Sequence, residues 1–321
     1  MTLLRYFLGA ALCAALQVGS AQTFPERPIQ LIVGFPPGGG VDIVARQLAE
    51  TLSDSLGQRV VVENRAGAAG NIAMEYVARA KPDGYTLLMG NLGMLTANPV
   101  LYPKLSIDPS KDFAPVARVV VTPLLAAVPF SLPAQNVQQL IAMAKAKPNE
   151  MSFGSGGNGN INHLAGELLK LQTGTQIKHV PYKGSAQALT DLMGGHIQLV
   201  IDGFNVVQPS VASGKARAIA ITGDTRSPVM PDVPTMKEFG LGDLVIYGWQ
   251  GVLAPAGTPP SIIEKLTQEV ARALANPALK ARLSGQGTEP SYLNPVQFRS
   301  YITGEQVRWA NVISSAKITL D

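Results

Sequence analysis

Two glycine-rich loops carry the residues best suited to chemistry in this sequence. The first, residues 34–40 (GFPPGGG), lies between a β-branched run and a segment of helical period. Consecutive glycines leave backbone N–H groups unshielded and let a ligand approach the main chain closely. The positive end of the following helix dipole favours an anion at that point. The loop therefore predicts an anion site, with a tight turn that binds nothing as the alternative.

Neither loop has the residues that nucleotide chemistry requires. A phosphate-binding P-loop needs Lys and Ser/Thr after its last glycine, but Gly40 and Val41 occupy those positions. The second loop, residues 154–159 (GSGGNG), satisfies Gly-x-Gly-x-x-Gly between a strand and a helix. A dinucleotide site would also need an acidic residue at the end of the next strand, and that strand ends in residues 179–183, HVPYK. A carboxylate cradle of backbone N–H groups, Ser155 and Asn162 suits these residues better, and no cofactor is expected.

Two further loops follow strands in the same way. Residues 64–70 (NRAGAAG) follow one strand and residues 182–185 (YKGS) follow another. Arg65 and Lys183 are the candidate cations for an acidic ligand. Each is more often a solvated loop charge, so direct contact of either with a ligand stays open.

Constellations for catalysis or metal binding are scarce. The three histidines, His163, His179 and His196, are not spaced as a metal pair on a helix. Ser155 is not in a Gly-x-Ser-x-Gly elbow, because Phe153 replaces the first glycine. The sequence therefore predicts neither a metal site nor an enzyme.

Short β-branched runs alternate with longer segments of helical period along the chain. Strands are expected at residues 29–34, 60–62 and 85–89, and a helix at 41–56 that Gly57 ends. A second block repeats this order from residue 151, and an offset of 120 residues superimposes Gly34 on Gly154 and Gly39 on Gly159. Chance within a shared α/β architecture could produce much of this match. The rhythm predicts parallel sheets covered by helices on both faces.

The C-terminal third returns to a strand at 245–253 and then to helices. Ser261 is expected to cap the first of these helices in a capping box with Glu264, and Pro277 and Pro295 to open two more. If these helices rejoin the first block, the chain crosses twice between two lobes. The predicted boundaries are residues 22–122 with 224–321 for lobe 1, and 123–223 for lobe 2.

The N-terminus has the layout of a cleavable secretory signal. A positive start at Arg5, an apolar run over 6–16 and small residues to Ala21 predict a signal peptide of residues 1–21 and a periplasmic protein. The single cysteine, Cys13, lies inside that segment, so no disulfide is expected in the mature chain. Lys and Arg number 26 against 22 Asp and Glu, and they are scattered rather than clustered, which gives nucleic-acid binding no support.

Motifs along nearly the whole mature chain resemble the substrate-binding receptors of tripartite tricarboxylate transporters, the Bug receptors. The motifs that carry this resemblance are residues 24–29 (FPERPI), 32–46, 63–70 (ENRAGAAG), 81–85 (KPDGY), 98–102 (NPVLY), 111–113 (KDF), 181–184 (PYKG), 231–235 (PDVPT) and 254–259 (APAGTP).

The resemblance implies a type II periplasmic-binding-protein fold: two α/β lobes with a ligand cleft between them and two hinge crossings. It also implies hinge closure over a small carboxylate, such as a dicarboxylate or tricarboxylate, an acidic amino acid or an aromatic acid. Delivery to membrane permease subunits follows from the same resemblance. A monomer is expected. A ligand sensor, or an enzyme in which Asp42, Asp202 or His163 does acid–base work, is the alternative on the same fold.

The predicted site residues lie on these loops and at the ends of neighbouring strands. Some positions depart from the family, because residues 160–161 (NI) and 92–95 (LGML) offer few hydroxyl groups. This difference favours a less polar acid, aromatic or with an alkyl tail, over a citrate-like one. The predicted ligand-binding residues are Phe35, Pro37, Gly38, Gly39, Asp42, Asn64, Asn91, Ser155, Gly156, Asn158, Asn162, Tyr182, Gly184 and Asp202.

Overall fold

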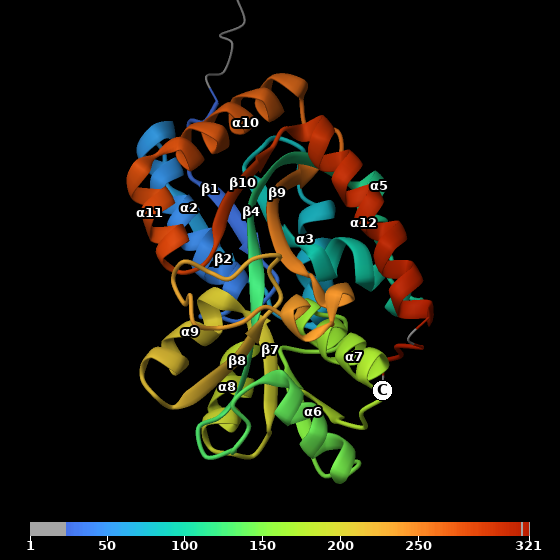
Figure 1. Ribbon diagram of the computed structural model, residues 1–321. Helices are drawn as coiled ribbons and strands as arrows, with labels where there is room; N and C mark the ends of the chain where they lie inside the picture. Colours follow the sequence, from blue (N-terminus) through green and yellow to red (C-terminus); the bar gives the residue numbers. More distant parts are fainter. Residues whose placement is uncertain (1–23, 316, 321) are drawn as a thin grey trace, which may run out of the picture.

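The computed structural model describes residues 24–315 and 317–320. The predicted signal peptide, with Cys13 inside it, lies outside the described residues. Figure 1 shows two α/β lobes, one above the other, with strand β4 running through both. Among the described residues, none of the helices is long and apolar enough to cross a lipid bilayer.

The strands and helices alternate along most of the chain. The strands are β1 (Ile29–Val33), β2 (Val60–Asn64), β3 (Thr86–Asn91), β4 (Phe113–Pro129), β5 (Ser152–Ser155), β6 (Lys178–Pro181), β7 (Leu199–Gly203), β8 (Ala216–Ile221), β9 (Tyr247–Pro255) and β10 (Glu289–Leu293). The helices are α2 (Gly40–Leu56), α3 (Asn71–Ala78), α4 (Asn98–Leu101), α5 (Pro109–Asp112), α6 (Val137–Ala146), α7 (Ile161–Thr173), α8 (Ser185–Met193), α9 (Phe204–Ala212), α10 (Pro260–Ala275), α11 (Pro277–Gly285) and α12 (Pro295–Ser315). Short helical turns are η1 (Ala68–Gly70), η2 (Gly93–Ala97), η3 (Lys237–Phe239) and η4 (Gly242–Leu244).

Each lobe is built on one mixed sheet, and the two sheets have the same strand order. The lobe-1 sheet begins β2-β1-β3 in parallel and continues with the antiparallel strand β9. The lobe-2 sheet begins β6-β5-β7 in parallel and continues with the antiparallel strand β4. In both lobes the first strand lies between the second and the third, so the glycine-rich loops that follow β1 and β5 occupy equivalent places. The predicted repeat at an offset of 120 residues therefore has a structural counterpart.

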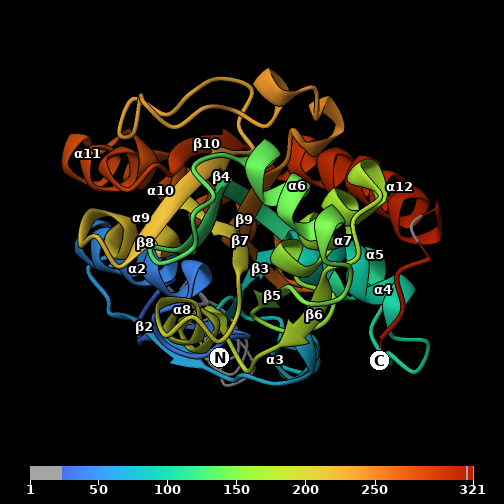
Figure 2. The same cartoon turned by 60° about the horizontal axis from the view of Figure 1, so that its bottom comes forward.

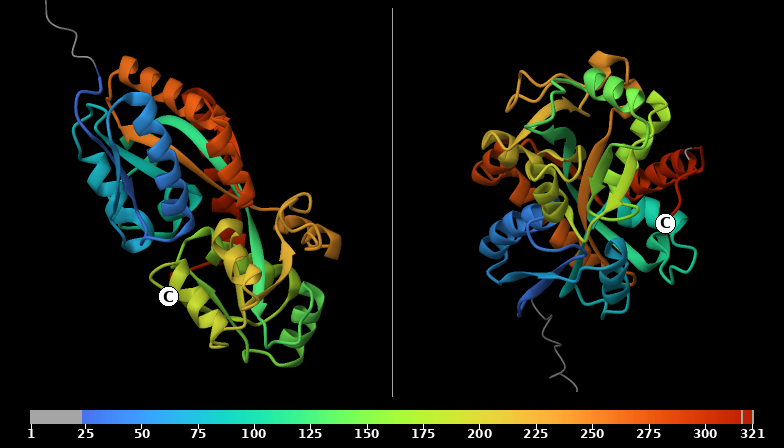
Figure 3. Two further views of the ribbon diagram at one scale, coloured as in Figure 1. Left: turned by 90° about the vertical axis from the view of Figure 1, so that its left-hand side faces the viewer. Right: turned by 90° about the horizontal axis from the view of Figure 1, so that it is seen from below.

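Strand β4 belongs to both sheets and forms one of the crossings between the lobes. It pairs with β9 as far as Pro123, and with β7 from Leu124 onward. Figure 3 (left) shows this strand leaving the upper lobe and entering the lower one. The other crossing is the segment between β8 and β9, which runs from Thr222 to Ile246. The Ile246 N–H donates to the Thr222 carbonyl at 3.1 Å. The Thr222 hydroxyl also accepts from the Leu124 N–H at 2.8 Å, so the two crossings are hydrogen-bonded to each other.

Helix α2 illustrates how the sequence pattern produces these elements. Its buried residues repeat at helical spacing and include Val44, Leu48 and Leu52, which pack toward β1 and β2. Gly57 ends the helix with φ = 65°, a left-handed conformation in which glycine carries no Cβ penalty. Seen from below, α8 and α9 lie on one side of β7, and α6 and α7 on the other (Figure 2).

The structure corrects one prediction about helix starts and adds two unpredicted strands, β4 and β10. Helix α10 begins at Pro260 and has no side-chain cap, so the predicted capping box of Ser261 and Glu264 is wrong. The sequence interpretation also missed β4 as a strand. All of its residues but three are buried, so the alternation that marks a half-exposed strand is missing.

Candidate functional site

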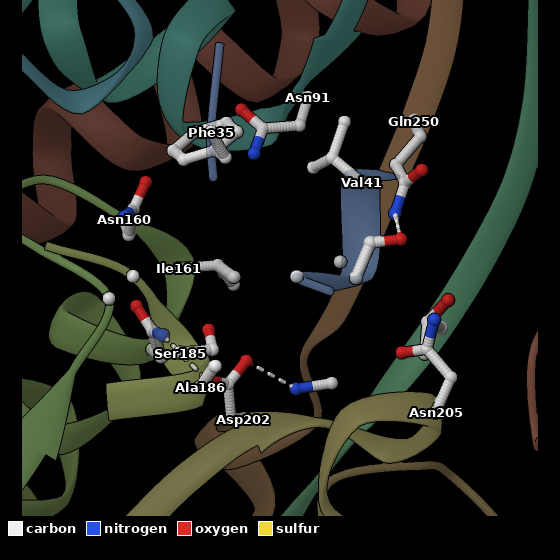
Figure 4. A pocket seen from close by; sticks show the side chains of 18 of the residues that line it. Phe35, Val41, Asn91, Asn160, Ile161, Ser185, Ala186, Asp202, Asn205 and Gln250 are labelled. Atoms are coloured by element: carbon white, nitrogen blue, oxygen red, sulfur yellow. Dashed lines mark hydrogen bonds between the residues drawn. The ribbon is translucent and has the colours of Figure 1, made fainter. Parts of the chain in front are cut away.

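A cavity of about 260 Å³ lies between the lobes, at the ends of strands from both sheets. It is smaller than the pockets of roughly 300–1,000 Å³ that hold drug-sized ligands. Figure 4 shows side chains from both lobes pointing into it. The lining residues are Phe35, Pro36, Pro37, Gly39, Gly40, Val41, Asn91, Leu92, Thr122, Leu124, Gly156, Asn160, Ile161, Asn162, Lys183, Gly184, Ser185, Ala186, Gln187, Asp202, Gly203, Asn205, Gly248, Trp249 and Gln250.

Four helices begin at this cavity, α2 from lobe 1 and α7, α8 and α9 from lobe 2. Their N-cap residues are Gly39, Asn160, Gly184 and Gly203. The structure describes all four starts, and at none of them does the side chain of the N-cap residue accept a hydrogen bond from a first-turn amide. The first-turn amides of a helix have no intrahelical acceptor, and the helix dipole is positive at that end. The cavity is therefore a place where main-chain donors from both lobes can bind an anion.

Ionisable side chains are few in the lining. Among the described residues that line the cavity, Lys183 and Asp202 are the ionisable ones, and Lys183 is exposed. Asp202 is buried on the lobe-2 side, where one carboxylate oxygen accepts from Asn162 at 2.8 Å and the other from the Gly203 N–H at 2.7 Å. The Ser185 hydroxyl donates to the same carboxylate. Burial raises the pKa of Asp202, and the hydrogen bonds that it accepts only partly oppose this effect.

The structure brings eight of the fourteen predicted site residues to the cavity wall. Three of the predicted loops contribute to this group, and so do the ends of β3 and β7 and the start of α7. The eight residues are Phe35, Pro37, Gly39, Asn91, Gly156, Asn162, Gly184 and Asp202.

Three of the other six predicted residues form a cluster beside the first loop. The Asp42 carboxylate accepts from the Gly38 N–H at 3.0 Å and from Asn64 at 2.8 Å, and it pairs with Arg46 at 2.9 Å. Burial alone would raise the pKa of Asp42, but hydrogen bonds from Arg46, the Gly38 amide and Asn64 together lower it. The polar groups of Gly38, Asp42 and Asn64 hold the first loop in place, and these three residues do not line the cavity.

The last three predicted residues are also engaged within the protein. The Ser155 hydroxyl lies 2.6 Å from His179 Nε2, and the Tyr182 hydroxyl donates to Asp191 at 2.6 Å. Burial and the hydrogen bond to Asp191 raise the pKa of Tyr182 to about 12. The Asn158 carbonyl accepts from Tyr102 of lobe 1 at 3.3 Å. These residues support the second loop from outside the cavity.

The two candidate cations have different surroundings. Arg65 pairs with Glu63 at 2.7 Å and stacks over the Tyr76 ring at 3.5 Å, away from the cavity lining. Lys183 lies at the cavity wall. Arg65 is therefore occupied within lobe 1, and Lys183 is the cation that a ligand could meet.

The sequence interpretation missed several lining residues, including Ser185, Asn205 and Gln250. Ser185 follows a strand and opens a helix, so the rule that identified Gly39 would have found it. Gln250 donates from Nε2 to the Gly40 carbonyl at 3.2 Å, a contact between residues 210 positions apart. No local pattern indicates such a contact.

The lobes touch each other around the cavity. A Cβ placed on Gly184 would lie 3.1 Å from Pro36 of lobe 1, and a Cβ on Gly40 would lie 3.3 Å from Val206 of lobe 2. Together with the hydrogen bond from Tyr102 to Asn158, these approaches describe a closed arrangement of the two lobes.

Comparison with known proteins identifies the family. The sequence profile of the tripartite tricarboxylate transporter family receptor matches residues 44–318. The chain belongs to this receptor family. Protein BugT of Bordetella pertussis (strain Tohama I) is 42% identical over 295 residues, which is 92% of this chain and 90% of BugT.

Two solved structures of similar proteins agree with this family assignment. The structure of R. palustris Rpa4515 with adipate has a TM-score of 0.90 and 37% identity, over 92% of this chain and 99% of that one. The periplasmic binding protein BugD has a TM-score of 0.88 and 34% identity, over 92% and 99% of the two chains. The predicted Bug resemblance and the periplasmic-binding-protein fold are thus confirmed.

Proposed function

We propose that this chain is a periplasmic receptor that captures a small carboxylate by closing its two lobes, delivers it to a membrane permease and catalyses nothing. The main support is the convergence of four helix starts, from both lobes, on one cavity between them, with no hydrogen bond from an N-cap side chain at any of the four. A carboxylate that accepts from both sets of amides would bind the closed state more tightly than the open one. Only such a difference in affinity lets a ligand shift the equilibrium toward closure.

The family supports the assignment to transport, and the lining supports an acid with an apolar body. Phe35, Leu92, Leu124 and Ile161 contribute apolar surface to the cavity. Rpa4515, a similar protein, has been solved with adipate, which has a methylene chain between its carboxylates. We therefore expect an aliphatic or aromatic acid rather than a citrate-like ligand.

The proposal extends to the organisation of the protein. Cleavage after Ala21 would release the chain into the periplasm as a monomer. The lobe boundaries would lie at residues 122/123 and 223/224, close to where β4 changes partner strand and to Thr222 at the second crossing.

The enzyme alternative has less support than the receptor. Asp42 and His163 do not line the cavity, and both accept hydrogen bonds from loop amides. Asp202 lines it without a partner base among the lining residues of the described chain. A sensor function gains no specific support from the site.

A ligand screen tests the proposal. The exported protein should be stabilised against heat by one or more acids from a panel of adipate, malate, citrate, benzoate and their uncharged amides, because a ligand that binds the folded state raises its stability. The amides should have no effect. Stabilisation by an amide as strong as by its acid, or conversion of a bound acid into product, would contradict a carboxylate receptor.

Substitution of Gly39 by Val tests the site itself. Gly39 has φ = −78°, and the nearest atom to an added Cβ is the Pro36 carbonyl oxygen at 3.6 Å, so the fold should tolerate the change. The larger side chain would occupy the approach to the first amides of α2 and abolish calorimetric binding. Gly304→Val, at an exposed glycine of α12, is the matched control and should bind normally. Unchanged affinity in Gly39→Val would place the ligand elsewhere.

A further inference from the structure

Two histidines stack on each other behind the second glycine-rich loop, outside the cavity. The rings of His163, on α7, and His179, on β6, lie 4.0 Å apart between centroids and 21° from parallel. His179 also stacks on Phe153 at 4.8 Å. His163 is 3% exposed. The function proposed above makes no use of this pair.

His163 holds the backbone of that loop through a hydrogen bond that requires a neutral ring. Its Nδ1 accepts from the Gly159 N–H at 3.1 Å. A backbone amide can only donate, so Nδ1 must carry a lone pair and the ring proton belongs on Nε2. Protonation of Nδ1 would set two donors against each other and break the contact.

The same loop forms part of the contact between the closed lobes. Gly159 has φ = 83°, and a Cβ on it would lie 3.0 Å from Asn98 Oδ1 of lobe 1. The Tyr102 hydroxyl of lobe 1 donates to the neighbouring Asn158 carbonyl at 3.3 Å. The position of the loop backbone, which His163 fixes, therefore decides whether these contacts between the lobes can form.

His179 is also held in a neutral state. Its Nε2 lies 2.6 Å from the Ser155 hydroxyl, and within the described part of the chain its buried Nδ1 has no hydrogen-bond partner. Burial, followed by the neighbouring His163 and Lys170, lowers the pKa of His179 to about 3.

The other ionisable groups that face the pair are few. Glu167 of α7 lies 4.0 Å from His163 Nε2 and is paired with Lys170 of the same helix at 2.7 Å. Tyr102 approaches the loop from lobe 1. On β6, Lys178 is exposed, and Tyr182 follows the strand with its hydroxyl bound to Asp191.

We propose that His163 and His179 are positioning residues for lobe closure, and that protonation of the pair in a mildly acidic medium releases loop 156–160 and weakens ligand capture. A histidine that stays neutral while loop 156–160 is packed in place regains its ordinary pKa of about 6.5 once the loop opens to water. The packed state of the loop therefore has its full stability relative to the open state above about pH 6.5, and it loses that stability as the pH falls. Between pH 7.5 and 5.5, the open form gains about tenfold for one released histidine and up to about a hundredfold for both.

Hydrogen exchange of the ligand-free protein tests this proposal directly. After correction for the intrinsic pH dependence of exchange, the opening constant of amides 156–160 should rise at least about tenfold from pH 7.5 to 5.5. The double variant His163→Asn/His179→Gln places amide groups where the two bonded ring nitrogens lie, but it cannot titrate, so its opening constant should stay level. His196→Asn, at the exposed third histidine, should behave as the natural protein. An opening constant that stays level in the natural protein, or rises equally in the double variant, would overturn the proposal.

Two further measurements separate a positioning role from a merely structural one. His163→Phe keeps an aromatic ring but removes the acceptor, so the loop should be open at both pH values, and His163→Asn alone should restore its protection.

The part of the proposal that concerns capture rests on the proposed function and uses adipate as the probe. Protonation of adipate itself affects all variants equally, so its affinity should fall more in the natural protein than in the double variant. Equal falls would contradict weakened capture, whereas an opening loop in a protein that binds no acid of the panel would contradict only the proposed function.

Discussion

The helix starts at the cavity differ from three helix starts elsewhere in the protein. Outside, Asn136 caps α6 by accepting from the Gln139 N–H at 3.0 Å, and Asn276 caps α11 by accepting from the Ala278 N–H at 2.9 Å. Before α12, Asn294 and Gln297 exchange two hydrogen bonds as a capping box. At the cavity, the N-cap residues of α2, α7, α8 and α9 make no such side-chain hydrogen bond.

This difference teaches how a site without an arginine can bind an anion. Glycine in place of a capping side chain costs a helix only a few tenths of a kcal/mol, so the three glycine N-caps among these four starts lower the stability of the protein slightly. Three helices outside the cavity also have no side-chain cap, for other reasons. Helices α3 and α4 follow directly on the short helical turns η1 and η2, and α10 begins with Pro260, which has no N–H to satisfy. At the cavity the amides are present, and a ligand can take the place of the cap.

The strongest way to break the comparison is to give α2 the cap that it does not have. Gly39→Asp would place a carboxylate on the first amides of the helix, in the position proposed for the ligand. Hydrogen bonds to charged groups contribute about 1.5–3 kcal/mol each, so the loss of one or two should lower ligand affinity about a hundredfold. The free energy of unfolding should be equal or higher by a few tenths of a kcal/mol. Calorimetry and urea denaturation measure both effects.

The same change at Gly304 in α12 controls for the added charge and should leave affinity unaltered. If Gly39→Asp bound the ligand as tightly as the natural protein, the amides of α2 would have no part in binding.

A second prediction distinguishes N-cap side chains that stabilise the fold from helix starts that are proposed to bind the ligand. Asn276→Ala should reduce the free energy of unfolding by about 1 kcal/mol, because the amides of Ala278 and Leu279 lose their acceptor. Its ligand affinity should not change. Asn160→Ala, at the start of α7, removes no cap and should cost less than about 0.5 kcal/mol. Urea denaturation of the two variants would contradict the comparison if Asn160→Ala were the more destabilised.

The smallest effect is expected from the cation at the cavity wall. Lys183 is exposed, and exposed charge pairs contribute at most about 1 kcal/mol and are screened by salt. Lys183→Gln should therefore weaken binding less than about fivefold, and the difference should shrink in high salt. A much larger loss that persists in salt would make Lys183 a direct ligand and the amides secondary.

The sequence predicted the elements whose ends are marked by residues that interrupt regular structure, such as glycine. The glycines that lead into α2 and α8, and the glycine after α2, mark boundaries that local backbone conformation determines. Cavity positions at these boundaries, such as Gly39 and Gly184, were therefore within reach of a local rule.

Side chains whose partners lie far along the chain could not be predicted in this way. Asp42, Asn64 and Ser155 have the chemistry of ligand donors and acceptors, but the fold gives each of them a partner inside the protein. Whether a polar side chain faces the ligand or a neighbouring loop depends on tertiary contacts that its own residue type does not encode. Strand β4 escaped prediction for a related reason, since burial on both faces removes its alternating pattern.

The sharing of β4 by both sheets has a consequence for how the protein fails. If heat detached this strand from either lobe, that lobe would lose an interior member of its sheet and its neighbours would gain unpaired edges. Damage that begins in one lobe is thereby transmitted to the other along a single piece of backbone. The proposed function requires the two halves to move relative to each other, but they should melt together.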